Sequence, residues 1–435
     1  MASEFNCQAK SPNLLRLLMT DKSAQSHSAD SDVRMRGFSR RTTVDDAIAW
    51  LDAHSTRLPS ITVPLAEAAG RVLAERVVSD VDVPGFDRAM MDGFAVQAEQ
   101  VAGATPYNQQ PLEIVGASFP GRPFEATVGR GQAVRIMTGA PLPDGANAVL
   151  PAEVARVEGE VVHALGEVSP GKHVGNVGED VVRGATVLES GRQLRPQDLG
   201  VLSSIGAAQV ACVRCPRVCI IVTGNEVLPA GTRPRPNEIV DANGPMLESL
   251  ARRDGADIVH REIVPDDRAR IGAALETDAE VAIVSGGSSV GQEDFVPSIV
   301  AERGELAVHG VAMRPSSPTG MGRIGGMLVF LLPGNPVSCL CAYDFFAGRA
   351  IRRLGGRSGD WPYRTVRAPL AEKISSVVGR LDYARVVVQD DGVRPLAIGG
   401  ASVLTSTTRA DGFVLIPSDS EGFPEGSIVD VYLYD

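Results

Sequence analysis

The sequence contains no long uninterrupted apolar run. The longest, such as Met327 to Leu332, falls far short of the roughly 18 to 20 residues that cross a bilayer. The short apolar stretch from Leu14 to Met19 carries an arginine, and no small-residue cleavage pattern follows it, which argues against a signal peptide. We therefore expect a cytoplasmic protein that neither spans nor binds a membrane.

Excess positive charge is also missing, because 42 Lys and Arg face 53 Asp and Glu for a formal net charge of −11. A chain with a net negative charge has no general attraction to nucleic acid or to anionic lipid. The sequence therefore predicts no nucleic-acid partner. Any anionic ligand must be held by a local arrangement of donors.

Cysteine and histidine are scarce, with six of each in 435 residues. The cysteines form no spaced disulfide framework, which agrees with a reducing compartment. Cys212, Cys215 and Cys219 are spaced like part of a metal knuckle, but no fourth ligand follows and Cys219 lies in an apolar strand. These patterns argue against a zinc site and favour structural cysteines.

Glycine (46 residues) and proline (29 residues) stay below the share typical of low-complexity chains, and apolar residues reach 44%. The length suggests about three domains. Residues 1 to about 39 show no sustained period and predict a disordered tail. A capped helix is expected from Thr43, then a strand-dominated region over about 62–213, an α/β region from Val218, and short strands beyond residue 364.

The α/β region shows continuous apolar strands alternating with helices, as in a sheet covered on both faces. Strands are expected at about 257–263, 281–284, 306–313 and 327–332. Asn243 is expected to cap one helix, and Asn335 followed by Pro336 to open another.

Three glycine-containing loops directly follow predicted strands of this region: Thr223-Gly224, Ser285-Gly286-Gly287 through Gly291, and Pro333-Gly334-Asn335-Pro336. Ligands of open α/β sheets bind at the carboxyl ends of the strands, where backbone amides hold phosphate. One such loop is most often a plain turn, but three on one rim predict a phosphate pocket. No Walker or dinucleotide glycine motif is present, which argues against those two classes.

Three acids follow the same strands: Glu226, Asp241 and Asp294. Acids beside a phosphate pocket repel the ligand unless a divalent cation lies between them, and Mg²⁺ is commonly held by carboxylates plus substrate oxygens. Each acid alone is as readily a cap or a solvated surface group. Arg314 and Ser317, in a proline-containing turn, supply a cation and a hydroxyl to the same rim, unless that turn is only structural.

Several motifs from separate regions, taken together, resemble those of the MoeA-type molybdopterin molybdenumtransferases, which are related to the E domain of gephyrin. These are Phe86-Asp87 through Met91-Asp92-Gly93, Met137-Thr138-Gly139, Gly178-Glu179-Asp180, Thr223-Gly224 with Glu226, Asp241 with Asn243, Ser285-Gly286-Gly287, and Pro333-Gly334-Asn335-Pro336.

The resemblance implies a multidomain α/β plus β fold. Its expected parts are a tail (1–41), a discontinuous elongated linker domain (42–84 and 151–213), a β domain (85–150), a MogA/MoaB-like molybdopterin-binding α/β domain (214–363) and a small C-terminal β barrel (364–435).

The implied activity is the insertion of molybdenum from molybdate into adenylylated molybdopterin, with release of AMP and help from Mg²⁺. Glu226, Asp241 and Asp294 would bind metal or position the nucleotide, and Asp92 and Thr138 would complete the site from the partner subunit of a homodimer. A molybdopterin adenylyltransferase and molybdoenzymes are implied as partners. The implied binding residues are Thr223, Gly224, Ser285, Gly286, Gly287, Gly291, Arg314, Ser317, Pro333, Gly334, Asn335 and Pro336.

Three positions depart from the family pattern. Asn225 stands where Asp is common, Ser316 and Ser317 replace Gly-Lys, and Gly175 replaces an arginine. These departures leave open a carrier that binds molybdopterin or finished cofactor without turnover, and the tail with the dimer analogy leaves open a gephyrin-like scaffold. The enzyme is the preferred interpretation.

Overall fold

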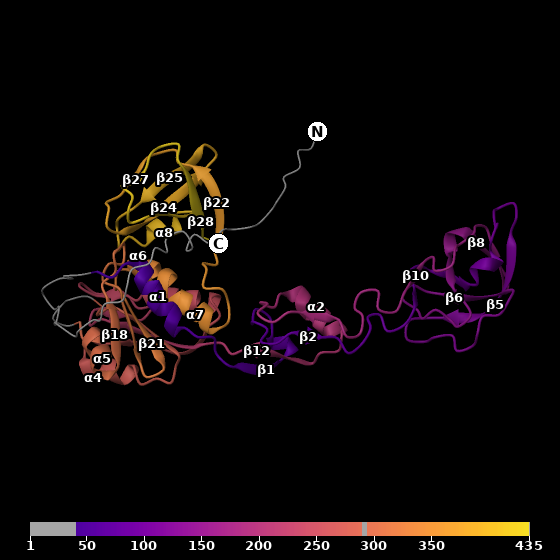
Figure 1. Cartoon of the computed structure of the whole chain (residues 1–435), viewed down its shortest axis with the longest axis horizontal. Coiled ribbons are helices and arrows are strands. Elements are labelled where there is room, and N and C mark those ends of the chain that lie inside the picture. The colour runs from indigo at the N-terminus through magenta and orange to yellow at the C-terminus, as the bar shows by residue number, and fades with distance from the viewer. Residues whose placement is uncertain (1–40, 289–293, 435) are drawn as a thin grey trace, which may run out of the picture.

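The computed structural model describes residues 41–288 and 294–434, and it shows an elongated molecule (Figure 1). An α/β domain carries the C-terminal β domain on one side, and a narrow linker joins it to a second β domain at the far end. This arrangement confirms the expected fold class. The predicted tail lies outside the described residues except for Arg41. Within the described ranges, no helix has the length and apolar character needed to cross a bilayer.

A six-stranded sheet in the order β16-β13-β17-β21-β20-β18 forms the centre of the α/β domain. Its first four strands are parallel, and β20 and β18 add an antiparallel edge. The strands are β13 (Arg217–Thr223), β16 (Asp257–Val264), β17 (Val281–Ser285), β18 (Glu305–His309), β20 (Gly320–Ile324) and β21 (Met327–Leu332). The strand expected over 306–313 ends early, because the chain leaves this sheet after His309 and enters the C-terminal one.

Helices cover both faces of this sheet, as the continuous apolar strands predicted. Ile220 packs in one buried core and Ile221 in another, because successive side chains of a strand point to opposite faces. The first core includes α1 (Val44–His54), α3 (Asn243–Arg253), α6 (Pro336–Ala342), the π-helical turn η5 (Tyr343–Ala347) and α7 (Gly348–Leu354); the second includes α4 (Arg268–Ala274) and α5 (Val296–Arg303). The Thr43 hydroxyl caps α1 as expected.

The second β domain has a six-stranded sheet in the order β7-β4-β6-β5-β9-β8. Its strands are β4 (Gly93–Val96), β5 (Gln110–Ser118), β6 (Gln132–Ile136), β7 (Ala148–Pro151), β8 (Ala155–Glu158) and β9 (Val161–Ala164). The β domain was expected to end at residue 150, but its sheet continues through β8 and β9 to Ala164. The β8–β9 hairpin pairs with β5, and Val162 and Ala164 join Leu112 in its core.

The linker is built from short pieces around a small core. It contains β1 (Ser60–Pro64), β12 (Gln209–Val213), β2 (Val77–Val78), β11 (Thr186–Leu188), α2 (Pro196–Ser204) and, toward the β domain, β3 (Arg88–Ala89) with β10 (Val174–Gly175). The sequence did not predict α2, a helix of nine residues that contains Gly200. Cys212 is fully buried in this core and Cys219 in the α/β sheet, as expected of structural cysteines.

Three 3-10 turns lie at Leu65–Glu67, Ala98–Gln100 and Ala152–Val154.

The C-terminal β domain is joined to the α/β domain by a shared strand, because β19 pairs in parallel with β24. Its sheet comprises β19 (Met313–Arg314), β22 (Arg364–Pro369), β24 (Leu381–Gln389), β25 (Gly392–Ala397), β26 (Gly412–Ile416) and β28 (Ile428–Leu433), beside the β23 (Ile374–Ser375) and β27 (Gly422–Phe423) pair and α8 (Thr405–Thr408). The Tyr383 and Phe413 rings stack at 4.1 Å in the core between the domains.

A buried acid lies between these two domains. The Asp344 carboxylate in η5 is fully buried, accepts a hydrogen bond from Tyr363 Oη at 2.9 Å and lies 3.5 Å from Arg253. Burial, opposed by the Arg253 charge and the Tyr363 hydroxyl, raises the pKa of Asp344 from 3.8 to about 6.

The raised pKa predicts a pH-dependent stability. The folded protein protonates Asp344 more readily than the unfolded chain does. Protonation of Asp344 therefore adds to the free energy of unfolding fully below pH 4, and this contribution is lost as the pH rises through 6. Relative to Asp344→Asn, the wild-type free energy of unfolding should rise by up to about 3 kcal/mol between pH 7 and pH 4. Denaturant titrations of both proteins at the two pH values measure this, with the exposed Asp430→Asn as control. A wild-type advantage that does not change with pH would contradict it.

Candidate functional site

The three predicted loops meet at the carboxyl edge of the parallel strands. Gly286 N–H donates to the Leu332 carbonyl at 3.0 Å, and a Cβ added at Gly286 would lie 2.6 Å from the Thr223 carbonyl oxygen. A Cβ added at Gly334 would lie 3.7 Å from Gly286 Cα. The loops after β13, β17 and β21 therefore form one rim, as predicted. Gly291 falls outside the described residues.

Asn243 joins two of these loops, a role that the sequence did not predict. It was expected to cap α3, but Ala242 is the N-cap and Asn243 is the first helical residue. Its amide Nδ2 donates to Ser285 Oγ at 2.9 Å and to the Gly334 carbonyl at 2.7 Å. The only sequence signal for this role was its position two residues after Asp241.

Two polar atoms of the rim are buried without a hydrogen-bond partner in the described part of the chain. They are Thr223 Oγ1 and Asn243 Oδ1, on side chains that are each 6% exposed. Leaving a buried polar group unsatisfied costs about 1–3 kcal/mol, and native proteins rarely retain one without a reason. The rim therefore offers polar atoms to a ligand.

The three predicted acids do not converge in one cluster. Glu226 is exposed before β14 (Val227–Leu228), and Asp241 is buried after β15 (Ile239–Val240). The parallel register of the two strands offsets these acids by three residues, or roughly 10 Å. Asp294 Oδ1 lies near Gly287, 3.9 Å from where a Cβ would stand.

Among the described residues, no three His, Cys, Asp or Glu side chains gather closely enough to hold a metal. A three-carboxylate cage is therefore not assembled there. Mg²⁺ commonly uses only one or two carboxylates plus substrate oxygens. Single rim acids such as Asp241, whose Oδ1 accepts the Gly244 N–H at 2.8 Å, still fit that mode, and the metal assignment stays a prediction.

Arg314 is less available than the sequence suggested. Its Nη2 donates to Asp382, a fully buried carboxylate that also accepts from Arg380 Nε at 3.1 Å and Ser376 Oγ at 2.7 Å. The Arg314 charge is thus already paired across the two domains. Arg314 Nε and Ser317 Oγ nevertheless remain buried without a partner in the described residues.

A second arginine, Arg385 on β24, was missed by sequence reasoning. It is fully buried, and its Nη2 donates to the Gly399 carbonyl. Its Nε and Nη1 have no partner among the described residues. The sequence signal was a charged residue interrupting an apolar strand, Tyr383 to Val388.

The surroundings of Arg385 connect it to the predicted loops. Val337 N–H, at the start of α6, donates to the Ala401 carbonyl at 2.9 Å, two residues beyond the Arg385 acceptor. Ser316 Oγ donates to the Ser338 carbonyl at 2.5 Å. We call the meeting place of residues 314–318, the start of α6, Arg385 and residues 399–401 the seam.

Asp92 and Thr138 form a pair at the far end of the molecule. Asp92 Oδ1 accepts hydrogen bonds from both the N–H and the hydroxyl of Thr138, each at 2.7 Å. Both bonds lower the pKa of Asp92, and the bond from the Thr138 backbone N–H has the larger effect. The antiparallel pairing of Gly93 with Ile136 brings the two turns together. Both turns belong to the β domain, which one chain holds well away from the rim (Figure 1).

Two of the family departures, Asn225 and Gly175, have local explanations, and Ser316 has none. Asn225 Oδ1 accepts the Asp266 N–H at 3.2 Å on the surface. A Cβ added at Gly175 would lie 2.8 Å from Glu179 Oε2 and 3.4 Å from Arg88 Nε, so Arg88 already supplies a cation there. Ser316 has a φ of 87°, a conformation that favours glycine.

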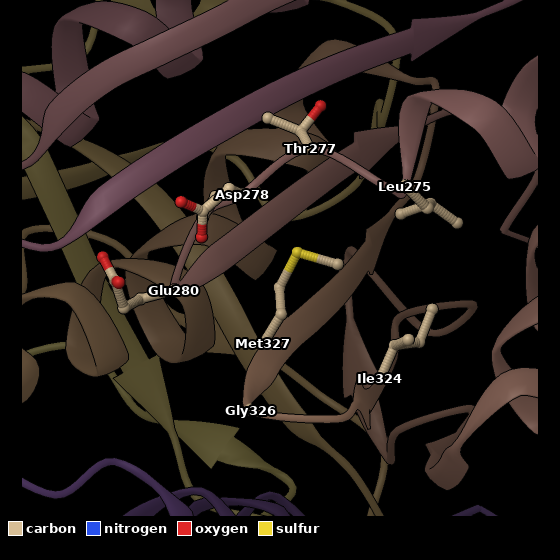
Figure 2. A pocket seen from close by; sticks show the side chains of 8 residues that line it. Leu275, Thr277, Asp278, Glu280, Ile324, Gly326 and Met327 are labelled. Atoms are coloured by element: carbon tan, nitrogen blue, oxygen red, sulfur yellow. The ribbon is translucent and has the colours of Figure 1, made fainter.

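A separate cavity of about 340 Å³ opens at the opposite end of the sheet (Figure 2). Asp278 and Glu280 line it together with apolar residues. It lies beside the amino ends of β17 and β21, away from the edge where such sheets bind ligands. Its acids are already paired with Arg214 and Arg217, so we do not place the site there.

Comparison with known families gives matches in chain order. Residues 42–206 match the MoeA N-terminal region (domains I and II), residues 219–353 match a probable molybdopterin-binding domain, and residues 367–434 match the MoeA C-terminal region (domain IV).

Similar proteins agree with these matches. Molybdopterin molybdenumtransferase 2 of Mycobacterium tuberculosis is 36% identical over 386 residues, covering 86% of this chain and 94% of that protein. Molybdopterin molybdenumtransferase of Staphylococcus epidermidis is 30% identical over 403 residues, covering 90% and 95%. The crystal structure of the molybdopterin biosynthesis MoeA protein of Pyrococcus horikoshii matches with a TM-score of 0.78 at 32% identity, covering 91% of this chain and 99% of that one. The chain belongs to the MoeA family of molybdopterin molybdenumtransferases.

Proposed function

We propose that this chain inserts molybdenum from molybdate into adenylylated molybdopterin and releases AMP. The observation that carries the proposal is Arg385, a buried guanidinium beside the loops that the family motifs mark, with two nitrogens that lack a hydrogen-bond partner among the described residues. Burying an unpaired charge is strongly unfavourable, so a bound anion is the expected partner. Molybdate is a tetrahedral dianion, so N–H and O–H donors such as those of the seam are the groups that would bind it.

The seam supplies donors of two kinds. Arg385 offers Nε and Nη1, and Ser317 Oγ and Arg314 Nε are also buried and unpartnered in the described residues. Guanidinium groups bind oxyanions through parallel N–H bonds, which are stronger than neutral ones. Because Asp382 already pairs Arg314, Arg385 carries most of the positive charge.

The rim would hold the pterin and the phosphates of the adenylylated substrate. Amides of the glycine loops suit phosphate oxygens, and Thr223, Ser285 and Asn243 offer polar side-chain atoms. A bound Mg²⁺ would neutralise phosphate charge, with Asp241, Asp294 or Glu226 contributing a carboxylate. These side chains orient the substrate so that its dithiolene faces the oxyanion of the seam.

A homodimer would complete the site. Asp92 and Thr138 lie far from the rim of their own chain, so they reach a rim only from a second copy. Exposed apolar side chains occur on the neck between linker and β domain: Phe86, Met90, Val177 and Val182 are 47–59% exposed. Such exposed apolar surface commonly marks an interface.

The relatives named as transferases favour an enzyme over a carrier or scaffold. The chemistry also implies a supplier and a consumer: an adenylyltransferase that makes the activated molybdopterin, and molybdoenzymes that accept the finished cofactor. We place this exchange in the cytoplasm.

Replacing Arg385 tests the oxyanion site. Arg385→Met should raise the KM for molybdate at least about tenfold, while the ligand-free protein becomes no less stable, because an unpaired buried charge is removed. Rates of AMP release against molybdate concentration, with thermal unfolding of the ligand-free proteins, measure both effects. Arg367→Met, at a side chain that is 74% exposed, is the matched control. A destabilised variant with unchanged molybdate dependence would show that Arg385 is purely structural.

Mixing two impaired variants, at a molybdate concentration far below the KM of Arg385→Met, tests the shared site. In a heterodimer of Asp92→Ala and Arg385→Met, one of the two sites receives both intact residues. Random exchange of equal amounts should therefore restore about a quarter of wild-type AMP release. Native mass spectrometry verifies the exchange. No recovery despite verified heterodimers would mean that each site is built within one subunit.

A further inference from the structure

We infer that Asn243 recognises an N–H group on the edge of the bound heterocycle, and that it sets substrate specificity at the rim. This inference rests on the proposed function and deepens it by naming the residue and the ligand edge. The supporting observation is the unpartnered, buried Asn243 Oδ1.

The orientation of the Asn243 amide follows from its partners. The Gly334 carbonyl can only accept a hydrogen bond, so the group 2.7 Å from it must be the amide nitrogen. The same nitrogen lies 2.9 Å from Ser285 Oγ, and its two N–H bonds are thereby both used. Oδ1 is consequently turned away from both loops, and flipping the amide would place oxygen against oxygen.

Among the described residues, Oδ1 then remains an acceptor without a donor. Asn243 is 6% exposed, so bulk water does not readily satisfy it. An amide oxygen cannot donate, and its ligand must therefore present N–H or O–H. Thr223 Oγ1, the other unpartnered atom of the rim, lies on the loop that contacts Gly286. Two such atoms at one sheet edge suit a donor-bearing heterocycle.

The adenylylated substrate offers two such edges. The pterin carries a ring N–H and an amino group, and adenine carries an amino group. Both sources present the same chemistry, an in-plane N–H donor. A site built around a hydrogen bond discriminates strongly against a ligand that lacks the donor, because the buried acceptor is then left unsatisfied.

Binding of four compounds tests the inference and identifies the edge. Titration calorimetry compares pterin with its N3-methyl, N2-dimethyl derivative, and AMP with N6,N6-dimethyl-AMP. For the wild-type protein, one of the two pairs should differ by about 10- to 100-fold in Kd. In Asn243→Ala the ratio of that pair should fall to near one, while Asn108→Ala, in an exposed loop of the β domain, should keep the wild-type ratio.

A merely structural Asn243 would make a different prediction. Loss of the bridge between Ser285 and Gly334 would weaken both members of a pair equally and leave their ratio unchanged. If Asn243→Ala does not fold, Asn243→Leu keeps a side chain of similar size without the acceptor, and it should likewise bring the ratio to near one. A ratio preserved in folded Asn243→Ala or Asn243→Leu overturns the inference.

Molybdate-dependent AMP release by the wild-type protein is measured alongside. Its absence would count against the proposed function. Normal release without discrimination in either pair, or without binding of any of the four compounds, would overturn the role of Asn243 alone.

Discussion

A guanidinium buried between two domains without an anionic partner among the described residues is the constraint on which the proposed function depends. Arg385 is fully enclosed, and only one of its nitrogens has a hydrogen-bond partner among the described residues, a carbonyl. Packing alone does not compensate such a group, so an anionic ligand is its expected partner. The neighbouring Arg314–Asp382 pair shows the alternative, a cation whose charge is satisfied internally. The contrast distinguishes an arginine whose charge is balanced within the protein from one whose charge, in the proposed function, a bound anion balances.

The elongated shape separates the two regions that the proposed site combines. The α/β domain with the rim lies at one end of the molecule, and the β domain, whose turns carry Asp92 and Thr138, lies at the other. Thr138 holds the pKa of Asp92 down, so this carboxylate is presented as an anion on an exposed turn. A site that needs both regions has to draw on two chains.

Much of the fold was predictable because strand and helix signals are local. Continuous apolar runs identified β13, β17 and β21, and Thr43 marked the start of α1. The β8–β9 hairpin was assigned to the wrong domain, because pairing with β5 is a long-range event without a local signal.

The site was predictable to the extent that topology determines it. Parallel strands bring their carboxyl ends to one edge, so Thr223, Ser285 and Gly334 had to meet. Whether a polar atom is left without a hydrogen-bond partner depends on which residues surround it in the folded protein. Three features therefore emerged only from the structure: the pairing of Arg314 with Asp382, the nitrogens of Arg385 without partners among the described residues, and the hydrogen bonds by which Asn243 joins two loops.

The central claim, that this MoeA-family chain turns over its substrate instead of only carrying it, is tested most directly in a single turnover. Excess wild-type protein is mixed with adenylylated molybdopterin, with and without molybdate, and AMP is quantified. The account predicts AMP release matching the bound substrate only when molybdate is present. Tight binding of the substrate with no AMP released in either case would contradict it.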